Sequence, residues 1–121
     1  MANYYLIDSC VWIEHFMTNN KKPFLDQEIP LALSTLSFFE IIKKLKNLNF
    51  PPKKINHIIN YFKEYNLILP TDTTIALEAT NFPPKQLSAM DALIYTTANI
   101  HNCIFVTQDN DFRGLPNVQF I

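Results

Sequence analysis

Short apolar runs alternate along this chain with longer segments of helical spacing, and this order limits the possible folds more than any other feature. The apolar runs predict strands at residues 3–7, 31–35, 67–69, 103–107 and 118–121. The segments between them predict helices at residues 9–18, 37–47, 52–66, 73–81 and 88–101. Because strands joined by helical crossovers pair in parallel, the pattern predicts an α/β fold with a mainly parallel sheet. The nearly all-apolar run CIFVT is typical of a strand that is covered on both faces.

The length and composition of the chain fit one domain over residues 1–121, with no linker, internal repeat or low-complexity segment. Cys10 and Cys103 belong to no C-x-x-C pair, so we expect two reduced core residues rather than a disulfide or a zinc site. No apolar run approaches the roughly 20 residues of a membrane span, and no basic stretch precedes an apolar one. These features lead us to expect a soluble cytoplasmic protein without membrane contact.

Glycine is scarce, because Gly114 is the only one in the chain. The dinucleotide-binding G-x-G-x-x-G motif, the P-loop and the G-x-S-x-G nucleophile elbow each need at least two glycines. The sequence therefore excludes these three sites. Any chemistry must come from side chains rather than from a glycine-rich loop.

Acidic residues occur where the predicted strands end or where the following helices begin. Asp8 ends the first strand, and Asp109 and Asp111 follow the strand at residues 103–107. Glu40 and Asp91 lie in the first turns of predicted helices. In open parallel sheets the ligand crevice lies beyond the carboxyl ends of the strands. We therefore expect these five acids to converge at one edge of the sheet.

Helix capping offers a purely structural explanation of the same acids. The segments SFFE at residues 37–40 and SAMD at residues 88–91 have capping-box spacing. Asp8 or Ser9 fits an N-cap, and Asp111 could cap a turn. Capping is compatible with ligand binding, since a helix N-terminus favours negative charge. It does not explain why so many acids gather at one edge.

Convergence of the acids has an energetic consequence. Two carboxylates about 4 Å apart repel each other by about 4 kcal/mol at an effective dielectric constant of about 20. Such a group must either take up protons or bind a cation. Oxygen-only ligands suit hard ions such as Mg²⁺ or Mn²⁺. Zinc would favour histidine or cysteine, but His15, His57 and His101 show no paired spacing, and we expect them on the surface or in the core.

Six lysines lie between residues 41 and 63 with no acid among them, although the net charge of the whole chain is −1. They form either a solvated helical face or a phosphate-contacting surface whose binding would weaken with salt. In the second case Lys43, Lys44 and Lys46 are candidate contacts to the phosphates of a nucleic acid. Tyr5 and Trp12 are aromatic candidates for base stacking, as is Phe112, but aromatic residues at such positions are expected in the core.

Four segments, taken in order, resemble the PIN domain. They read YLIDSCVWIEHF, LSTLSFFEII, LSAMDALIYTTA and IFVTQDNDF, and together they span essentially the whole chain. In size and motif order the chain resembles the VapC-type toxin ribonucleases of this family. The resemblance implies a three-layer α/β/α sandwich around a mainly parallel central sheet. It also implies a Mg²⁺- or Mn²⁺-dependent endoribonuclease that cuts single-stranded or loop RNA and leaves 5′-phosphate and 3′-hydroxyl ends.

The resemblance also implies roles for individual residues. The four acids of the family correspond to Asp8, Glu40, Asp91 and Asp109, which would hold the metal and carry catalysis. Asp111 matches a further acid that many members place two residues after the fourth.

Two hydroxyl residues and the partners complete the resemblance. Ser9 and Thr107 match small hydroxyl positions beside the first and the last acid. As the toxin of a type II toxin–antitoxin system, such a protein would form a homodimer. An antitoxin would inhibit it by covering the acidic pocket with its C-terminal segment, often with an arginine reaching in.

Three other functions share parts of this pattern. RNA-processing nucleases and structure-specific DNA nucleases use the same acidic α/β architecture, but the short chain favours the compact toxin type. A phospho-receiver domain needs a pair of acids after its first strand, whereas the segment IDSC has one. A non-catalytic binding module with an acidic pocket is the third alternative. Metal titration followed by an RNA cleavage assay separates them.

Overall fold

Five parallel strands form the centre of the protein, for which the computed structural model describes residues 3–121. The spatial order of the strands is β3-β2-β1-β4-β5, and every neighbouring pair is parallel. The strands are β1 (Tyr5–Ile7), β2 (Leu31–Ser34), β3 (Asn66–Leu69), β4 (Ile104–Thr107) and β5 (Val118–Phe120). The chain moves outward from β1 to β3 and then returns to place β4 on the other side of β1. The strand order therefore reverses between β1 and β4.

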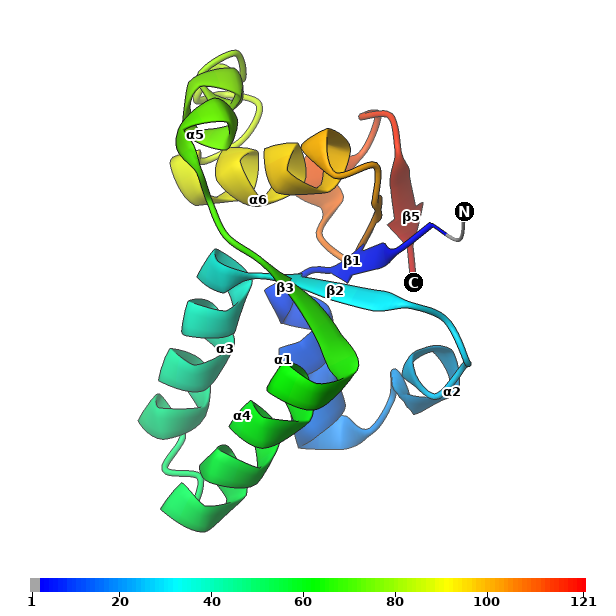
Figure 1. Cartoon of the computed structure of the whole chain (residues 1–121), viewed down its shortest axis with the longest axis vertical. Helices are drawn as coiled ribbons and strands as arrows, with labels where there is room; N and C mark the ends of the chain where they lie inside the picture. Colours follow the sequence, from blue (N-terminus) through cyan, green and yellow to red (C-terminus); the bar gives the residue numbers. More distant parts are fainter. Residues whose placement is uncertain (1–2) are drawn as a thin grey trace.

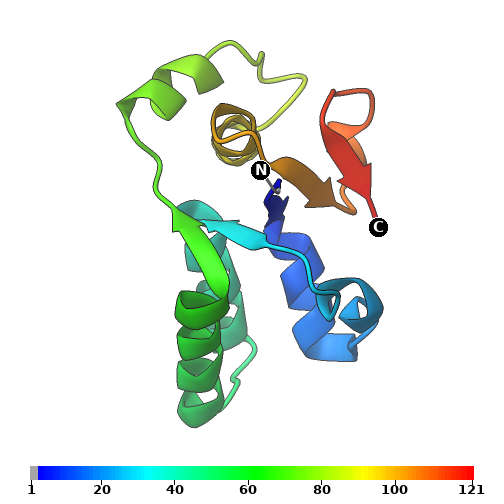
Figure 2. The ribbon, with the colours of Figure 1, turned by 45° about the vertical axis from the view of Figure 1, so that its right-hand side comes forward.

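Helices cover both faces of this sheet. They are α1 (Ser9–Thr18), α2 (Lys22–Leu25), α3 (Thr35–Asn47), α4 (Pro52–Tyr65), α5 (Thr73–Ala79), α6 (Ala89–Ile100) and the 3₁₀ helix η1 (Asn110–Phe112). Figures 1 and 2 show α5 and α6 on one side of the sheet and α1, α3 and α4 on the other. The predicted three-layer α/β/α sandwich with a parallel central sheet is confirmed.

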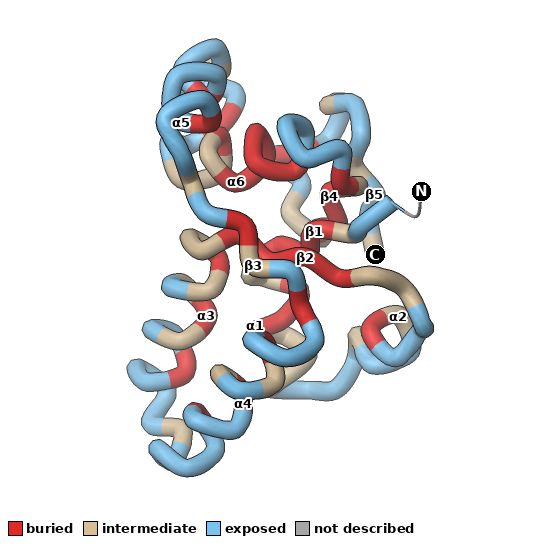
Figure 3. Tube along the Cα trace, in the orientation of Figure 1, coloured by how far each residue is buried: buried red, intermediate tan, exposed pale blue. Residues whose placement is uncertain are grey.

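Side-chain alternation along the strands supplies two cores. Leu6 of β1 and Phe105 of β4 pack into the core beneath α5 and α6. The next residue of each strand, Ile7 and Val106, packs into the core against α1, α3 and α4. Successive strand side chains point to opposite faces, so both faces of a central strand must be apolar when helices cover both. Figure 3 shows the buried residues concentrated along the sheet and on the helix faces that meet it.

The second core contains an aromatic cluster around Trp12 of α1, which is 1% exposed. The ring of Phe62, on α4, meets the Trp12 ring at a centroid distance of 4.9 Å in an edge-on arrangement. Phe16 stacks on the same indole at 5.8 Å, and Tyr61 approaches it at 5.9 Å. Such pairs add to the free energy of apolar burial, so the cluster fixes α4 against α1. Trp12 and Phe112 are core residues, as expected.

The start of α3 differs from the predicted capping box. The N-cap is Ser34, whose Oγ accepts a hydrogen bond from the backbone N–H of Leu36 at 3.0 Å. Ser37 lies inside the helix, is fully buried, and its hydroxyl has no hydrogen-bond partner among residues 3–121. The capping prediction for SFFE was therefore wrong. The chain leaves the sheet at Ser34 with an extended backbone, so the earlier serine takes the cap.

Smaller differences concern element ends and one short helix. The single turn α2 contains Pro23 near its start and was not predicted, because one turn is too short to show helical periodicity. Cys10 and Cys103 are free thiols, as expected. Among residues 3–121, no helix combines the length and apolar character that crossing a bilayer requires.

Truncating Phe62 should strongly destabilise the fold. The side chain is fully buried within the aromatic cluster, so Phe62→Ala leaves a cavity and should lower the free energy of unfolding by about 3–5 kcal/mol. Tyr65→Ala is the control on the same helix. Tyr65 is 62% exposed, so this variant should lower the free energy of unfolding by only about 0.5 kcal/mol. Urea denaturation measures both values. Equal losses in the two variants would contradict the packing described here.

Candidate functional site

The site lies at the carboxyl edge of β1 and β4. The register pairs Ile7 with Val106, so the residues that follow these two strands emerge side by side. The backbone N–H of Asp8 donates to the carbonyl of Val106 at 2.9 Å, which extends the pairing by one step. The strand order reverses between β1 and β4, and this is the edge at which open parallel sheets generally bind ligands. Asp8 and Asp109 both follow these two strands at this edge.

Asp8 is held by three donors. It is 5% exposed and forms the N-cap of α1, where its Oδ1 accepts from the backbone N–H of Ser9 at 2.8 Å. Its Oδ2 accepts from the hydroxyl of Thr107 at 2.8 Å. The same Thr107 oxygen accepts from the backbone N–H of Asp109 at 3.0 Å. One hydroxyl group therefore links the first and the fourth of the predicted acids.

The third donor is a thiol that the sequence analysis had placed only in the core. The Sγ atom of Cys10 lies 3.4 Å from Asp8 Oδ2 and 3.7 Å from the Thr107 hydroxyl. Burial, together with the negative charge of Asp8, raises the pKa of Cys10 to about 12. The thiol therefore stays protonated at neutral pH and can donate to Asp8. Its position two residues after the strand-ending acid was the only signal in the sequence.

Three further acids complete a compact group. Asp91, Asp109 and Asp111 each offer a carboxylate oxygen, and these atoms all lie within 4.8 Å of one another. Asp109 caps η1 through a 2.9 Å hydrogen bond from the backbone N–H of Asp111. The Oγ of Ser88 caps α6 by accepting from the N–H of Asp91 at 3.2 Å, as the SAMD spacing predicted. The helix caps thus hold the carboxylates beside one another.

Glu40 approaches this group from α3. Burial raises the pKa of Glu40, and the charges of Asp8 and Asp91 raise it further, whereas a hydrogen bond with the Ser9 side chain acts in the opposite direction. Burial likewise raises the pKa of Asp91, and the charges of Asp8, Asp109 and Asp111 add to the effect. The structure therefore places five carboxylates near enough for the charge on one to affect the ionisation of its neighbours: Asp8, Glu40, Asp91, Asp109 and Asp111.

The pKa of Asp8 is also raised, although three groups donate hydrogen bonds to its carboxylate. Burial is the largest influence and raises the pKa of Asp8, while the hydrogen bonds from Thr107, Cys10 and the backbone of Ser9 lower it. The negative charge of Asp109 raises it again. Burial, together with negative charge from at least one neighbouring carboxylate, therefore raises the pKa values of Asp8, Glu40 and Asp91, and the acids of this group are costly to ionise together.

The donor set fits a hard divalent cation. All five side chains offer carboxylate oxygens, the ligand type preferred by Mg²⁺ and Mn²⁺. Burial and, to a smaller extent, neighbouring negative charges raise the pKa values of Asp8, Glu40 and Asp91, and such an ion would stabilise their charged forms. Asp91, Asp109 and Asp111 lie close enough to share one ion, and Asp8 and Glu40 border them.

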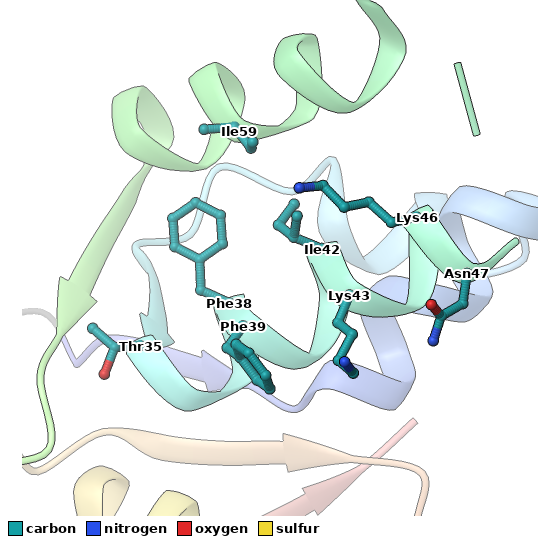
Figure 4. Close-up of a pocket in the computed structure, with 8 residues that line it drawn as sticks. All are labelled: Thr35, Phe38, Phe39, Ile42, Lys43, Lys46, Asn47 and Ile59. Atoms are coloured by element: carbon teal, nitrogen blue, oxygen red, sulfur yellow. The ribbon is translucent and has the colours of Figure 1, made fainter. Parts of the chain in front are cut away.

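The three candidate lysines lie along two adjoining grooves. Lys43 and Lys44 line a groove that also contains Ser9 and Glu40, so they border the acids. Lys46 lies in a second groove, between α3 and α4, where Figure 4 shows it on the side of α3 that faces Ile59, and Lys43 lines this groove too.

Comparisons with known proteins agree with this architecture. The PIN domain family model matches residues 5–118. A toxin–antitoxin complex from Klebsiella pneumoniae contains a chain with a TM-score of 0.81 and 23% identity, and the match covers 95% of each chain. VapBC-1 from nontypeable Haemophilus influenzae gives a TM-score of 0.76 at 20% identity, covering 98% of this chain and 96% of the other. FitAcB from Neisseria gonorrhoeae gives 0.68 at 20% identity, with coverages of 97% and 96%. At these identities the likeness establishes the fold. No curated protein sequence matches the chain.

Neutralising one acid should stabilise the metal-free protein at neutral pH. A raised pKa means that the folded state binds protons more tightly than the unfolded state, so this stability is fully present below the unfolded pKa values of about 4 and is lost as pH rises through the raised values. With chelator at neutral pH, Asp91→Asn should therefore raise Tm by several degrees, and the gain should shrink toward about pH 4.

The same variant should lose the response to metal. Mn²⁺ at about 100 times its Kd should stabilise the parent by about 2.7 kcal/mol, and Asp91→Asn by much less. Asp72→Asn is the matched control, because Asp72 caps α5 outside the site and asparagine can keep its hydrogen bond from the N–H of Ile75. Thermal unfolding with and without Mn²⁺ measures these shifts. Equal Mn²⁺ stabilisation of both variants would contradict a metal site at Asp91.

Proposed function

The chain belongs to the PIN domain family, and from this premise we propose that it is a Mg²⁺- or Mn²⁺-dependent endoribonuclease and the toxin of a type II toxin–antitoxin system. The observation that carries the proposal is the gathering of five carboxylates at the edge where the strand order reverses. Asp8, Glu40 and Asp91 there have pKa values raised by burial and, to a smaller extent, by the charges of neighbouring carboxylates. Such a group of acids is suited to a divalent cation and, through the cation, to a phosphate group.

In this proposal Asp8, Glu40, Asp91 and Asp109 hold the metal and Asp111 assists them. A divalent ion bound here would activate a water molecule for in-line attack and neutralise negative charge on the phosphodiester. The protein contributes the positions of the ligands. The Thr107 hydroxyl fixes Asp8 and Asp109 relative to each other, because it donates to the first and accepts from the backbone of the second.

Ser9 and Cys10 have supporting roles in the same proposal. The backbone N–H of Ser9 occupies Asp8 Oδ1, and the Cys10 thiol lies against Oδ2. Donors on both oxygens fix the orientation of the carboxylate before metal binds, as the partners of metal ligands do generally.

One observation favours a toxin over other nucleases. A chain of similar length and the same fold comes from a structure described as a toxin–antitoxin complex, from Klebsiella pneumoniae. We therefore propose an antitoxin partner and a homodimer for this chain, with RNA as the substrate and the cytoplasm as the location.

Removing the Glu40 carboxylate should abolish cleavage. Glu40→Gln keeps the size of the side chain but removes one charged ligand, so the rate of RNA cleavage should fall by about a hundredfold or more while the fold persists. Glu64→Gln, an exposed position on α4, is the matched control with the same chemical change. The assay incubates labelled single-stranded RNA, duplex RNA and DNA with Mn²⁺ and identifies the product ends. We expect 5′-phosphate and 3′-hydroxyl ends on RNA.

Three results would contradict this assignment. A folded Glu40→Gln variant that cuts RNA at the parental rate would remove Glu40 from the catalytic set. Preferential cleavage of DNA would favour a structure-specific DNA nuclease. No cleavage of any substrate by a parent that binds Mn²⁺ would favour a non-catalytic module.

Expression without a partner should arrest bacterial growth if the protein is a toxin. Arrest should depend on the chemistry of the site, so cells that express Glu40→Gln should grow like uninduced cells at equal protein levels, and Glu64→Gln should be as toxic as the parent. Growth curves with immunoblots measure both. Normal growth with active, soluble parent would contradict the toxin role but would leave the nuclease role intact.

A further inference from the structure

A groove of about 370 Å³ opens beside the acidic site and extends along α3. Its lining comes from three helices: Ser9 from α1, Phe39, Glu40, Lys43 and Lys44 from α3, and Met90 from α6. We call it the α3 groove. Its volume lies within the range of small-molecule sites, about 300–1,000 Å³. One end is acidic and belongs to the site described above, and the rest is basic and apolar.

Helical spacing sets the direction of the groove. Glu40 and Lys44 are four residues apart, as are Phe39 and Lys43, so each pair lies on one face of α3 about 6 Å apart along the axis. Lys43 and Lys44 therefore lie about one turn of α3 beyond Glu40. A chain that enters the site at Glu40 and continues along α3 would meet Lys44 and Lys43 next.

The two lysines are free to bind an external anion. Among residues 3–121 the ion pairs are Lys21 with Glu14 and Lys22 with Asp26, so neither Lys43 nor Lys44 is paired. Both side chains are exposed.

Phe39 is exposed although the helix has a buried face nearby. The residue is 58% exposed, and the Lys43 ammonium lies 5.9 Å from the centre of its ring. Figure 4 shows Phe38 and Ile42 turned toward Ile59 of α4, whereas Phe39 and Lys43 point away from Ile59, although both still border the groove between α3 and α4. Phe38 therefore packs against the core, whereas Phe39 remains on the surface. An exposed aromatic ring beside cations is the usual platform for stacking an unpaired base.

We propose that the α3 groove is the subsite for single-stranded RNA next to the scissile bond, with Phe39 stacking on one base and Lys43 and Lys44 contacting the neighbouring phosphates. This inference rests on the proposed ribonuclease function. It adds a specific contact that requires an unpaired base, because a base inside a duplex is stacked on its neighbours and cannot lie on the Phe39 ring. Loops and unpaired ends are therefore substrates, and continuous duplex is not.

Charge favours RNA over a peptide as the occupant. The groove places two unpaired lysines one helical turn from a group of acids that itself suits a divalent ion. A nucleic-acid backbone carries a negative charge at every nucleotide, so it can meet the ion and both lysines at once. A peptide would need acids at matching spacing together with an apolar residue for Phe39.

The first test measures RNA binding without cleavage. Each variant is built on Asp91→Asn, and its affinity for a labelled single-stranded oligonucleotide is measured by fluorescence anisotropy over a range of salt concentrations. Lys43→Ala with Lys44→Ala should reduce the slope of log K against log salt by about 1.4, or about 0.7 for each phosphate contact on a single strand. Phe39→Leu should weaken binding about tenfold, and Phe39→Tyr should retain it. Lys53→Ala with Lys63→Ala, two exposed lysines of α4, is the charge-matched control and should keep the parental slope.

The second test locates the subsite relative to the cut. Active protein and Phe39→Leu are assayed on oligonucleotides shortened from either end. Shortening from one side should raise KM about tenfold for the active parent but not for Phe39→Leu, because the variant has already lost that contact. Shortening from the other side should affect both equally.

The outcomes separate the two proposals. If the parent cleaves RNA while Phe39→Leu and the double lysine variant bind it with unchanged affinity and slope, the subsite is refuted and the nuclease stands. If continuous duplex RNA binds as tightly as single strands, the stacking role is wrong. If the variants bind RNA normally but lose a protein partner, the groove is a protein surface. A parent that neither binds nor cleaves RNA refutes both proposals.

Discussion

The repulsion among carboxylates at the edge of β1 and β4 is the interaction on which the rest of this structure depends. A protein would avoid this arrangement if stability alone mattered, because burial and neighbouring charge raise the pKa values of Asp8, Glu40 and Asp91. The fold maintains it through sheet topology, since two adjacent parallel strands end side by side. Favourable packing elsewhere, for example in the aromatic cluster around Trp12, must offset the unfavourable free energy of holding these carboxylates together.

Several residues serve the fold and the site at once. Asp8 caps α1 and Asp109 caps η1, so each carboxylate stabilises the start of a helix as well as contributing to the acidic group. Thr107 ends β4 and joins these two acids through one hydroxyl. The sequence analysis treated capping and ligand binding as compatible explanations of the acids. The structure shows that Asp8 and Asp109 are caps, and a cap holds a carboxylate at a helix N-terminus, where negative charge is favoured.

The sequence predicted the parallel strands, the main helices and the edge at which the acids meet, because these follow from periodicity and from the geometry of parallel sheets. Periodicity could not decide between neighbouring residues of similar type. Ser34 rather than Ser37 caps α3, because the point at which the chain leaves the sheet is a tertiary property. Phe38 rather than Phe39 faces α4, because that choice depends on how two helices pack. Cys10 was assigned to the core on composition, and only the positions of β1 and β4 place its thiol against Asp8.

The most direct test of the account is the location of the cation itself. Crystals grown at neutral pH with Mn²⁺ and measured at a wavelength where manganese scatters anomalously would show where the ion binds. The account predicts a peak within about 2.0–2.6 Å of carboxylate oxygens from the group of Asp8, Glu40, Asp91, Asp109 and Asp111. If no manganese peak lies near these carboxylates at saturating Mn²⁺, and the carboxyl groups are protonated or turned apart, the account is contradicted.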